Sequence, residues 1–575
     1  MTKMSIRTNK MKAVGVLMKQ LTTSRRKFHE RGRDESFDGE LEKLWLVLNN
    51  IKDVFVEVKK NEENLLDTLA EVYNHLHRLD SRKLHQDMHS ICERIKYSAR
   101  NLLPTLVFDE SYKEEDDRGG KISHSSQELV QSHQKQSWTA KDFNLQDDRL
   151  KVCLLRLLLI FPENAIIRKR IAINLWIAEG LIENTEKTAE ELGEDVIHNL
   201  LKLKVIVRYG STKDPRVNKF QIPPDIRSQL KLYLDGDLKS IRPSWLLLDR
   251  KKVIIGTKNI SLRNIFNIGA SYLNFKPQWV SELKNLEVLQ LGRWQDSPLY
   301  HVEVGSEEFL KELRTLKQLK YLSLRGISRI FELPSSIGEL ESLVILDLKA
   351  CHNLERLSDD ISSMKSLTHL IMSDCCLLEA MPKGIEKLTN LQVLKGFLIT
   401  TSEKTPCRIW DLAENLTDLR RLSIRIGSEA VIRDGEFKSL ENFPALKHLK
   451  ISWSVSDPRY AKIAIKLPLD LIKLHFECFP GKSFKKVFTT HEYMPSELNI
   501  TGGKMESMSD YFSMWKVNIQ SLKFLRQLNT LKILPLKYLK QLNVEVDDLK
   551  RFFPWLEYVE IKQISNHSNI EHRYE

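Results

Sequence analysis

The stretch LKQLKYLSLRGISRIFELPSSIGELESLVILDLKAC, residues 316–351, decides the fold because its leucines belong to a series with one fixed period. The step from Leu319 to Leu343 is repeated from Leu343 to Leu367 and again from Leu367 to Leu391. A short period of this kind indicates a solenoid, in which each turn buries its apolar side against the next turn. We therefore expect one short strand per turn, followed by a looser segment that brings the chain back.

Each turn carries a frame of apolar positions close to L-x-x-L-x-x-L-x-L, which predicts leucine-rich repeats over residues 236–575. Cys351 and Cys375 are separated by the same period and hold the position that asparagine or cysteine takes in every unit. Both thiols are therefore predicted to be structural rather than nucleophilic. The later units are spaced less regularly, and we expect the largest insertion at residues 481–521.

The side chains between the buried leucines are predicted to face the open, concave side, because strand side chains alternate between two faces. Basic residues outnumber acids there and mix with aromatic rings, a composition that suits an acidic protein surface. The predicted protein-binding residues are Tyr321, Arg325, Lys349, His369, Lys395, Phe397, Arg421, Arg425, His448, Lys450, Lys473 and His475.

A second informative stretch, LKVCLLRLLLIFPENAIIRKRIAINLWIAEGLI at residues 150–182, predicts two short helices that pack across one turn. Its apolar positions follow helical spacing, and Phe161 and Pro162 break the pattern. It resembles the winged-helix segment of plant intracellular disease-resistance proteins, the nucleotide-binding leucine-rich-repeat (NLR) receptors. The residues that carry the resemblance are Leu150, Lys151, Cys153, Phe161, Pro162, Glu163 and residues 175–180. The resemblance implies a winged-helix domain over residues 149–235.

Upstream of this domain, residues 40–103 show apolar stripes at helical spacing that a small antiparallel bundle would bury. We assign a basic tail and this bundle to residues 1–104, in a position that resembles the coiled-coil domain of one NLR class. Residues 105–148 are polar and are predicted to be a flexible linker. The predicted fold class is multidomain: an N-terminal helical bundle, a winged-helix domain and a C-terminal α/β leucine-rich-repeat solenoid.

The resemblance implies a nucleotide-binding region between the bundle and the winged helix, but only about forty linker residues stand there, too few for a βαβ fold. The nearest match to the phosphate-binding loop G-x-x-x-x-G-K-[ST] is at Gly481, and Phe476 replaces its first glycine. Pro223 and Pro224 stand where the family's Met-His-Asp motif has His and Asp. We predict no nucleotide cofactor, no metal site and no catalytic residues, and hence no enzyme activity.

Much of the net charge of +12 lies in residues 1–33, where ten Lys or Arg face one acid, Glu30. Three interpretations of this tail are open: a solvated, frayed terminus, a basic amphipathic helix on anionic membrane, and an organellar transit peptide. The seven cysteines are scattered, which is typical of reduced thiols, and no apolar run is long enough to span a membrane. We predict a cytoplasmic protein, peripheral at the plasma membrane where the tail binds lipid.

The predicted function is protein recognition in plant innate immunity, with a protein ligand or a partner immune receptor bound through the repeats. One alternative is a winged-helix protein that binds nucleic acid, and another is a repeat scaffold outside immunity. Residues 185–195, at the start of the helix that would enter a DNA groove, carry five acids and one Lys, so phosphates would repel it. The basic hairpin at residues 208–219 is interpreted as a solvated edge, and no nucleic-acid partner is expected.

Overall fold

A computed structural model of the chain describes residues 147–505 with short gaps, residues 531–537, 556–564 and 570–574, and a few isolated positions elsewhere. The predicted basic tail, the helical bundle and nearly all of the linker fall outside the described residues. These three predictions therefore stay predictions.

The chain forms two compact units. One consists of Pro104–Gly210 together with Val217–Pro243, and it contains the predicted winged helix. The other contains Ser244–Glu575, which hold the repeats, and it also includes the short segment Ser211–Arg216. This segment is the loop that joins the two strands of the basic hairpin.

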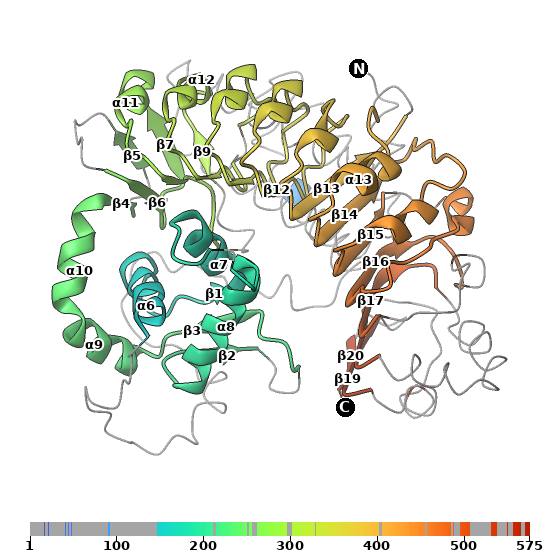
Figure 1. Ribbon diagram of the computed structural model, residues 1–575, viewed down its shortest axis with the longest axis horizontal. Coiled ribbons are helices and arrows are strands. Elements are labelled where there is room, and N and C mark those ends of the chain that lie inside the picture. The colour runs from blue at the N-terminus through green and yellow to red at the C-terminus, as the bar shows by residue number, and fades with distance from the viewer. Residues whose placement is uncertain are drawn as a thin grey trace. The chain divides into compact units, whose positions relative to one another are not determined.

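The first unit is a set of helices with a small antiparallel sheet in the order β1-β3-β2 (Figure 1). Its elements are α6 (Asp148–Ile160), β1 (Ile167–Arg168), α7 (Lys169–Ala178), α8 (Ala189–Lys202), β2 (Val207–Tyr209), β3 (Lys219–Gln221), α9 (Pro224–Tyr233), α10 (Asp235–Ile241) and η5 (Arg242–Ser244). Leu154, Leu158 and Trp176 of the predicted core are all buried. The Trp176 Nε1–H donates to the Cys153 carbonyl oxygen at 3.2 Å, so the ring's polar atom is satisfied inside this core.

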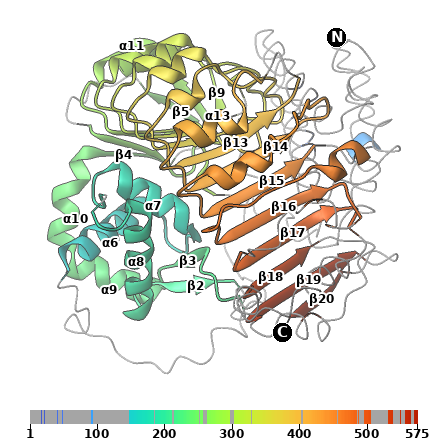
Figure 2. The same cartoon turned by 45° about the vertical axis from the view of Figure 1, so that its right-hand side comes forward.

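The second unit is a solenoid whose strands lie side by side as successive rungs (Figures 1 and 2). Among the described residues, one long sheet holds β4 (Trp245–Leu248), β6 (Asn264–Asn267), β8 (Val288–Gln290), β10 (Tyr321–Ser323), β11 (Ile345–Asp347), β12 (His369–Ile371), β13 (Val393–Ile399), β14 (Arg421–Ile426), β15 (His448–Trp453), β16 (Lys473–Phe479), β17 (Glu497–Gly503), β18 (Ile533–Lys537), β19 (Tyr558–Ile564) and β20 (Ile570–Tyr574). All neighbours in it are parallel except β19 and β20.

The return segments of the solenoid are short helices, and the first repeats add a second parallel sheet in the order β5-β7-β9. The strands of this sheet are β5 (Lys252–Ile255), β7 (Tyr272–Phe275) and β9 (Glu303–Val304). The helical segments are α11 (Pro277–Glu282), α12 (Phe309–Glu312), η6 (Leu313–Thr315), η7 (Ser335–Glu339), η8 (Asp359–Ser363), η9 (Ile385–Lys387), α13 (Ile409–Asn415), η10 (Lys438–Asn442) and η11 (Pro458–Lys462).

The constant period of these repeats places equivalent leucines in register. Leu322, Leu346 and Leu370 pair across β10, β11 and β12, and each is fully buried. The thiols of Cys351 and Cys375 donate to the carbonyl oxygens of the preceding turns at 3.0 and 3.1 Å. Burial raises the pKa of the Cys351 thiol to about 12, so it is not a nucleophile at neutral pH. The structural role predicted for the two cysteines is confirmed.

A β-bulge at Gly396 changes the alternation in β13. The pairing with β14 shifts between Lys395 and Phe397, and Gly396 has a φ of 90°, a conformation that favours glycine. Because the extra residue reverses the side-chain order, Phe397 is fully buried in the core of the repeats. The prediction that Phe397 faces the open side is therefore wrong.

The prediction of one large insertion at residues 481–521 is also wrong. Strand β17 lies inside that range and pairs in parallel with β16 and β18, so the range contains a further rung of the sheet. Leu498 and Ile500 supply its buried positions. The step from Leu474 to Leu498 is the same as that from Leu322 to Leu346, so the regular period could have identified this rung.

Candidate functional site

We call the side of the long sheet that faces away from the apolar core the inner face. Parallel strands in register place equivalent side chains about 4.8 Å apart, so the inner face consists of continuous rows. The first row is Val288, Tyr321, Ile345, His369, Val393, Arg421, His448, Lys473, Glu497, Ile533 and Tyr558. Over the same strands the second row includes Asp347, Ile371, Lys395, Ser423, Lys450, His475 and Asn499.

Several predicted side chains in the N-terminal half of the inner face are buried. Tyr321 and His369 are both 2% exposed, and Arg325 is 6% exposed. The neighbours of the two rings in the first row are apolar and themselves buried, as Ile345 between them illustrates. The prediction of an open surface is therefore wrong for these three residues, although they lie on the predicted side of the sheet.

Apart from the buried Phe397, the remaining predicted residues are half-buried. One of them, Lys349, follows β11 and forms an ion pair with Asp374 at 3.6 Å, and the others gather on β13 to β16. The half-buried residues on β13 to β16 are Lys395, Arg421, Arg425, His448, Lys450, Lys473 and His475. The structure thus brings most of the predicted basic residues together on four neighbouring strands.

Two lysines of this cluster form ion pairs with acids on the neighbouring strands. Lys450 Nζ lies 3.2 Å from Glu477 Oε1, and Lys473 Nζ lies 2.5 Å from Glu497 Oε1. Burial lowers the pKa of Lys450, but Glu477 and Asp374 outweigh it, so that pKa is raised. For Lys473 burial is the larger effect, and its pKa is lowered despite Glu497.

Arg425 joins separate repeats. Its guanidinium donates to the carbonyl oxygens of Cys375 and Leu378, at 2.9 and 3.3 Å, and both acceptors follow strand β12. Hydrogen bonds from a charged donor are stronger than those between neutral groups. Arg425 therefore has a structural role in addition to its place on the inner face.

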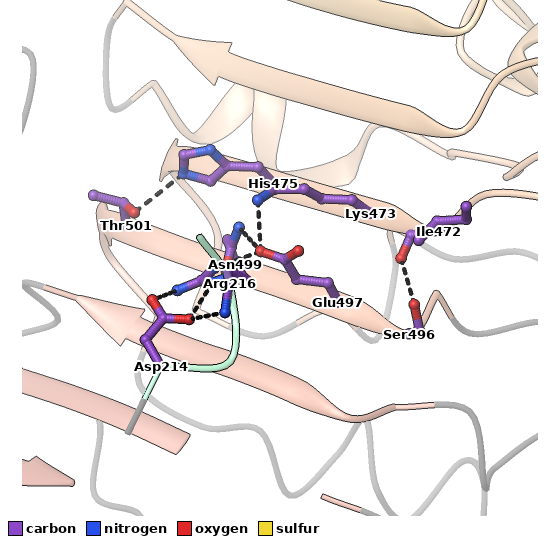
Figure 3. A network of polar contacts seen from close by, with 9 residues as sticks. All are labelled: Asp214, Arg216, Ile472, Lys473, His475, Ser496, Glu497, Asn499 and Thr501. Carbon is purple, nitrogen blue, oxygen red and sulfur yellow. Dashed lines mark hydrogen bonds and ion pairs between the residues drawn. The ribbon is translucent and has the colours of Figure 1, made fainter. Parts of the chain in front are cut away.

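The basic row ends at an acid that binds a second cation (Figure 3). Arg216, from the hairpin loop that belongs to the same unit as the repeats, lies with its Nη1 2.5 Å from Glu497 Oε1. The same oxygen accepts from Asn499 Nδ2 at 2.9 Å, and Asp214 holds the Arg216 guanidinium from the other side at 2.7 Å. The interpretation of Arg216 as part of a solvated edge is therefore wrong.

Acidic residues of the winged helix form ion pairs with basic residues of the same domain. On α8, Glu190 and Glu194 form ion pairs with Arg170, at 3.3 and 3.1 Å, and Lys169 is 2.5 Å from Glu194. The basic residues of α7 are thus already paired with carboxylates. A phosphate backbone would have to displace these partners before it could bind there.

Pro223 and Pro224 start a helix in the winged helix. Pro223 is the N-cap of α9 and Pro224 its first residue, a position where the missing N–H costs nothing. Arg227, one turn later, is buried and donates to the carbonyl oxygens of Leu158 and Phe161 at the end of α6. The Arg227 side chain therefore holds α9 against the end of α6.

The described part of the chain contains neither a metal cluster nor a membrane-spanning helix. No group of three or more His, Cys, Asp or Glu there is arranged to hold a metal ion. No helix among the same residues is long and apolar enough to cross a membrane.

Comparison with known families agrees with both units. Residues 261–570 match the family described as "Leucine-rich repeat region", and residues 160–223 match the "Disease resistance protein Winged helix domain". The chain is 29% identical over 380 residues to the Arabidopsis thaliana "Disease resistance RPP13-like protein 4", an alignment that covers 63% of this chain and 43% of that protein. A probable disease resistance protein of Arabidopsis thaliana is 26% identical, over 35% of this chain and 22% of its own length. The chain thus spans less than half the length of these curated relatives.

Two solved receptor structures are also similar to this chain. The plant peptide hormone receptor RGFR1 in complex with RGF2 aligns with 52% of this chain and 59% of its own, at 15% identity and a TM-score of 0.27. A TDR receptor aligns with 49% of this chain and 56% of its own, at 15% identity and a TM-score of 0.28.

Proposed function

Since this chain belongs to the leucine-rich-repeat family and is of the plant disease-resistance type, we propose that it serves innate immunity by binding a protein through its repeats. Its partner is a protein ligand or a partner immune receptor. The observation that carries this proposal is the cluster of half-buried bases on β13 to β16 of the inner face.

The rigidity of the repeats and the charge of their inner face both favour binding of a protein. A solenoid holds its inner-face side chains on a regular sheet, so a partner meets a fixed pattern of groups. Of the bases in the cluster, Lys395 and Arg421 stand on neighbouring strands and are only half-buried. Such a pattern favours an acidic protein surface and steers its approach.

A pull-down with the full-length protein from plant tissue tests the proposal. We expect the double charge reversal Lys395→Glu with Arg421→Glu to lower the recovery of bound proteins by about tenfold or more, as rim and inner charges of an interface do. Arg425 and Lys450 are left intact because they hold structural contacts.

The matched control reverses two bases outside the inner face. Lys383 and Lys387, beside η9, are exposed, and the variant Lys383→Glu with Lys387→Glu has the same change of charge. Equal recovery with both double variants would refute binding by the inner face.

We propose further that the protein acts without a nucleotide switch and without catalysis. Support comes from the two prolines at the start of α9, which supply neither a phosphate-binding imidazole nor a carboxylate. Calorimetry with ADP and ATP should give no binding, and micromolar affinity would contradict this part of the proposal.

The proposed location is the cytoplasm, with peripheral membrane binding by the basic residues 1–33. Flotation with vesicles of anionic lipid should carry the protein at low salt and release it as salt screens the charge. Binding that survives deletion of residues 1–33 would contradict it. Cleavage of the tail on import into chloroplasts or mitochondria would favour a transit peptide.

A further inference from the structure

The contacts of Arg216 resemble those of a bound ligand more than those of an ordinary surface arginine. Its Nε and Nη2 donate to the two Asp214 carboxylate oxygens at 2.8 and 2.7 Å, and its Nη1 donates to Glu497 at 2.5 Å. Its Cζ lies 5.7 Å from the centre of the Tyr558 ring. The Arg216 side chain is only 18% exposed, so the guanidinium is held by an acid on each side and by a ring.

The repeats supply their part of this arrangement from one row of the sheet. Glu497, Ile533 and Tyr558 are paired in register on β17, β18 and β19. Because the strands are about 4.8 Å apart, the acid and the ring stand roughly 10 Å from each other with an aliphatic side chain between them. This gap suits a flat guanidinium, which can hydrogen-bond at its edge while its face lies near a ring.

The Glu497 carboxylate is held in place by residues other than Arg216. Lys473 and Asn499 both donate to Glu497 Oε1 and fix the carboxylate (Figure 3). The charges alternate along the network, from Asp214 to Arg216 to Glu497 to Lys473, and sum to zero. If Asp214 and Arg216 leave together, the pair of Glu497 and Lys473 is still neutral, so no uncompensated buried charge remains.

We propose that Glu497, Ile533 and Tyr558 form a binding subsite for an arginine side chain, and that this chain's own Asp214–Arg216 segment occupies it. The subsite selects an arginine with an acid two residues before it, because Asp214 neutralises the second edge of the guanidinium. A protein partner that presents such a segment competes with Arg216. This inference goes beyond the proposed function: Lys473 of the basic cluster holds Glu497, but the ligand of the subsite is an arginine side chain rather than an acidic surface.

Lysine should not replace arginine in this subsite. An ammonium group is a compact point charge, whereas the guanidinium donates from separate nitrogens to Asp214 and Glu497 at once. A lysine that reached Glu497 would leave Asp214 without the two hydrogen bonds that the guanidinium donates, although the backbone N–H of residue 216 would still donate to it. The preference for arginine is thus a direct consequence of the geometry.

The test uses the full chain and a fluorescent peptide, acetyl-Ser-Thr-Lys-Asp-Pro-Arg-Val-amide, which repeats residues 211–217. In wild-type protein the attached segment is present at an effective concentration on the order of millimolar, so the free peptide competes poorly. We expect the variant Arg216→Ala to bind the peptide at least about tenfold more tightly than wild type in fluorescence anisotropy. A peptide with lysine in place of arginine should bind at least about tenfold more weakly.

Matched variants keep the test specific. In the Arg216→Ala background, Glu497→Gln should abolish peptide binding, whereas Glu557→Gln, an exposed acid beside β19, should leave it unchanged. Arg208→Ala, on strand β2 of the same hairpin, should bind the peptide no better than wild type does. Circular dichroism confirms that each variant is folded.

Three results would overturn the proposal: no peptide binding by folded Arg216→Ala at millimolar peptide, equal binding by wild type and Arg216→Ala, or equal binding of the arginine and lysine peptides. If Arg216→Ala does not fold, the variants Arg216→Lys and Glu497→Asp replace it in a double-mutant cycle of thermal unfolding. Additive shifts in that cycle would overturn the proposal, and coupled shifts would support it.

Discussion

The repeats of β10 to β12 differ from those of β14 to β17 in strand length and in what they place on the inner face. The first group has strands of three residues, and the side chains of its first row, Tyr321, Ile345 and His369, are at most 2% exposed. The second group has strands of six or seven residues, and its first row holds Arg421, His448, Lys473 and Glu497. The first-row side chains are thus almost fully buried in the first group, whereas the first row of the second group holds charged residues.

The two groups differ in part in the length of the repeating unit. The step along the chain is the same from Leu322 to Leu346 as from Leu346 to Leu370. The step from Leu422 to Leu449 is longer, and so, by less, is the step from Leu449 to Leu474. The step from Leu474 to Leu498 is again that of the first group, although β16 and β17 have seven residues each, so unit length alone does not set strand length. The longer strands contribute more main-chain hydrogen bonds to the sheet, whichever side chains lie on the inner face.

The largest expected effect concerns the core, where the two groups should behave alike. Leu370 and Leu449 are 0% and 2% exposed and lie in the same apolar core. Leu370→Ala and Leu449→Ala should each lower the free energy of unfolding by about 2–5 kcal/mol. Urea denaturation followed by circular dichroism measures both. A loss at Leu449 well under half of that at Leu370 would show that the irregular repeats differ in packing as well as in their inner face.

The second prediction concerns Gly396, the bulge at the junction of the two groups. A Cβ added there would lie 2.6 Å from the Met372 carbonyl carbon and oxygen, and the positive φ would strain any other residue. Gly396→Ala should therefore lower the free energy of unfolding by about 3 kcal/mol, from backbone strain and close contact together. The same urea denaturation measures this loss.

The control for this variant is Gly236→Ala in α10. A Cβ at Gly236 meets no atom within 4 Å, and alanine is the better helix former, so a gain of about 0.5–1 kcal/mol is expected. If Gly396→Ala leaves the free energy of unfolding unchanged, the bulge at Gly396 is not the reason why the Phe397 side chain lies in the core.

The leucine frame, the two buried cysteines and the winged-helix core follow from local patterns, and such patterns can be read from the sequence alone. Phe397 is misplaced by the sequence analysis because one extra residue reverses the alternation, and period counting does not detect a bulge. The contact between Arg216 and Glu497 joins positions 281 residues apart. No spacing rule links two such distant positions, and Glu497 itself lies within the range that the irregular spacing marks as an insertion.

The third prediction concerns Arg425, which ties β14 to the turn after β12 and so joins the two groups. Arg425→Gln shortens the side chain and removes the charge, and the carbonyl oxygens of Cys375 and Leu378 lose the hydrogen bonds from the guanidinium. We expect a loss of about 1–3 kcal/mol in the free energy of unfolding. Arg459→Gln is the control, because the Arg459 side chain is 73% exposed and pairs with Asp457, a neighbour in sequence, so its loss should be much smaller than that at Arg425. Equal losses at the two positions would mean that Arg425 does not join the groups.

The smallest expected effect is a pH dependence that belongs only to the charged repeats. Burial raises the pKa of Glu497, but Lys473 and Arg216 outweigh it and hold the pKa below its ordinary value of 4.5. A carboxyl whose pKa is lower in the folded state contributes stability that is present above its unfolded pKa. That contribution is lost as the pH falls from about 4.5 through the lower folded value.

Thermal unfolding between pH 7 and pH 3 tests this dependence, and wild type should show a steeper acid decline than Glu497→Gln because only wild type has the carboxylate to protonate. Glu557→Gln, which removes an exposed acid beside β19, should keep the wild-type slope. If Glu497→Gln and wild type decline in parallel, the carboxylate is not stabilised by its two cations. The charged face would then not depend on this network for stability, and the contrast between the two groups of repeats would be one of surface chemistry alone.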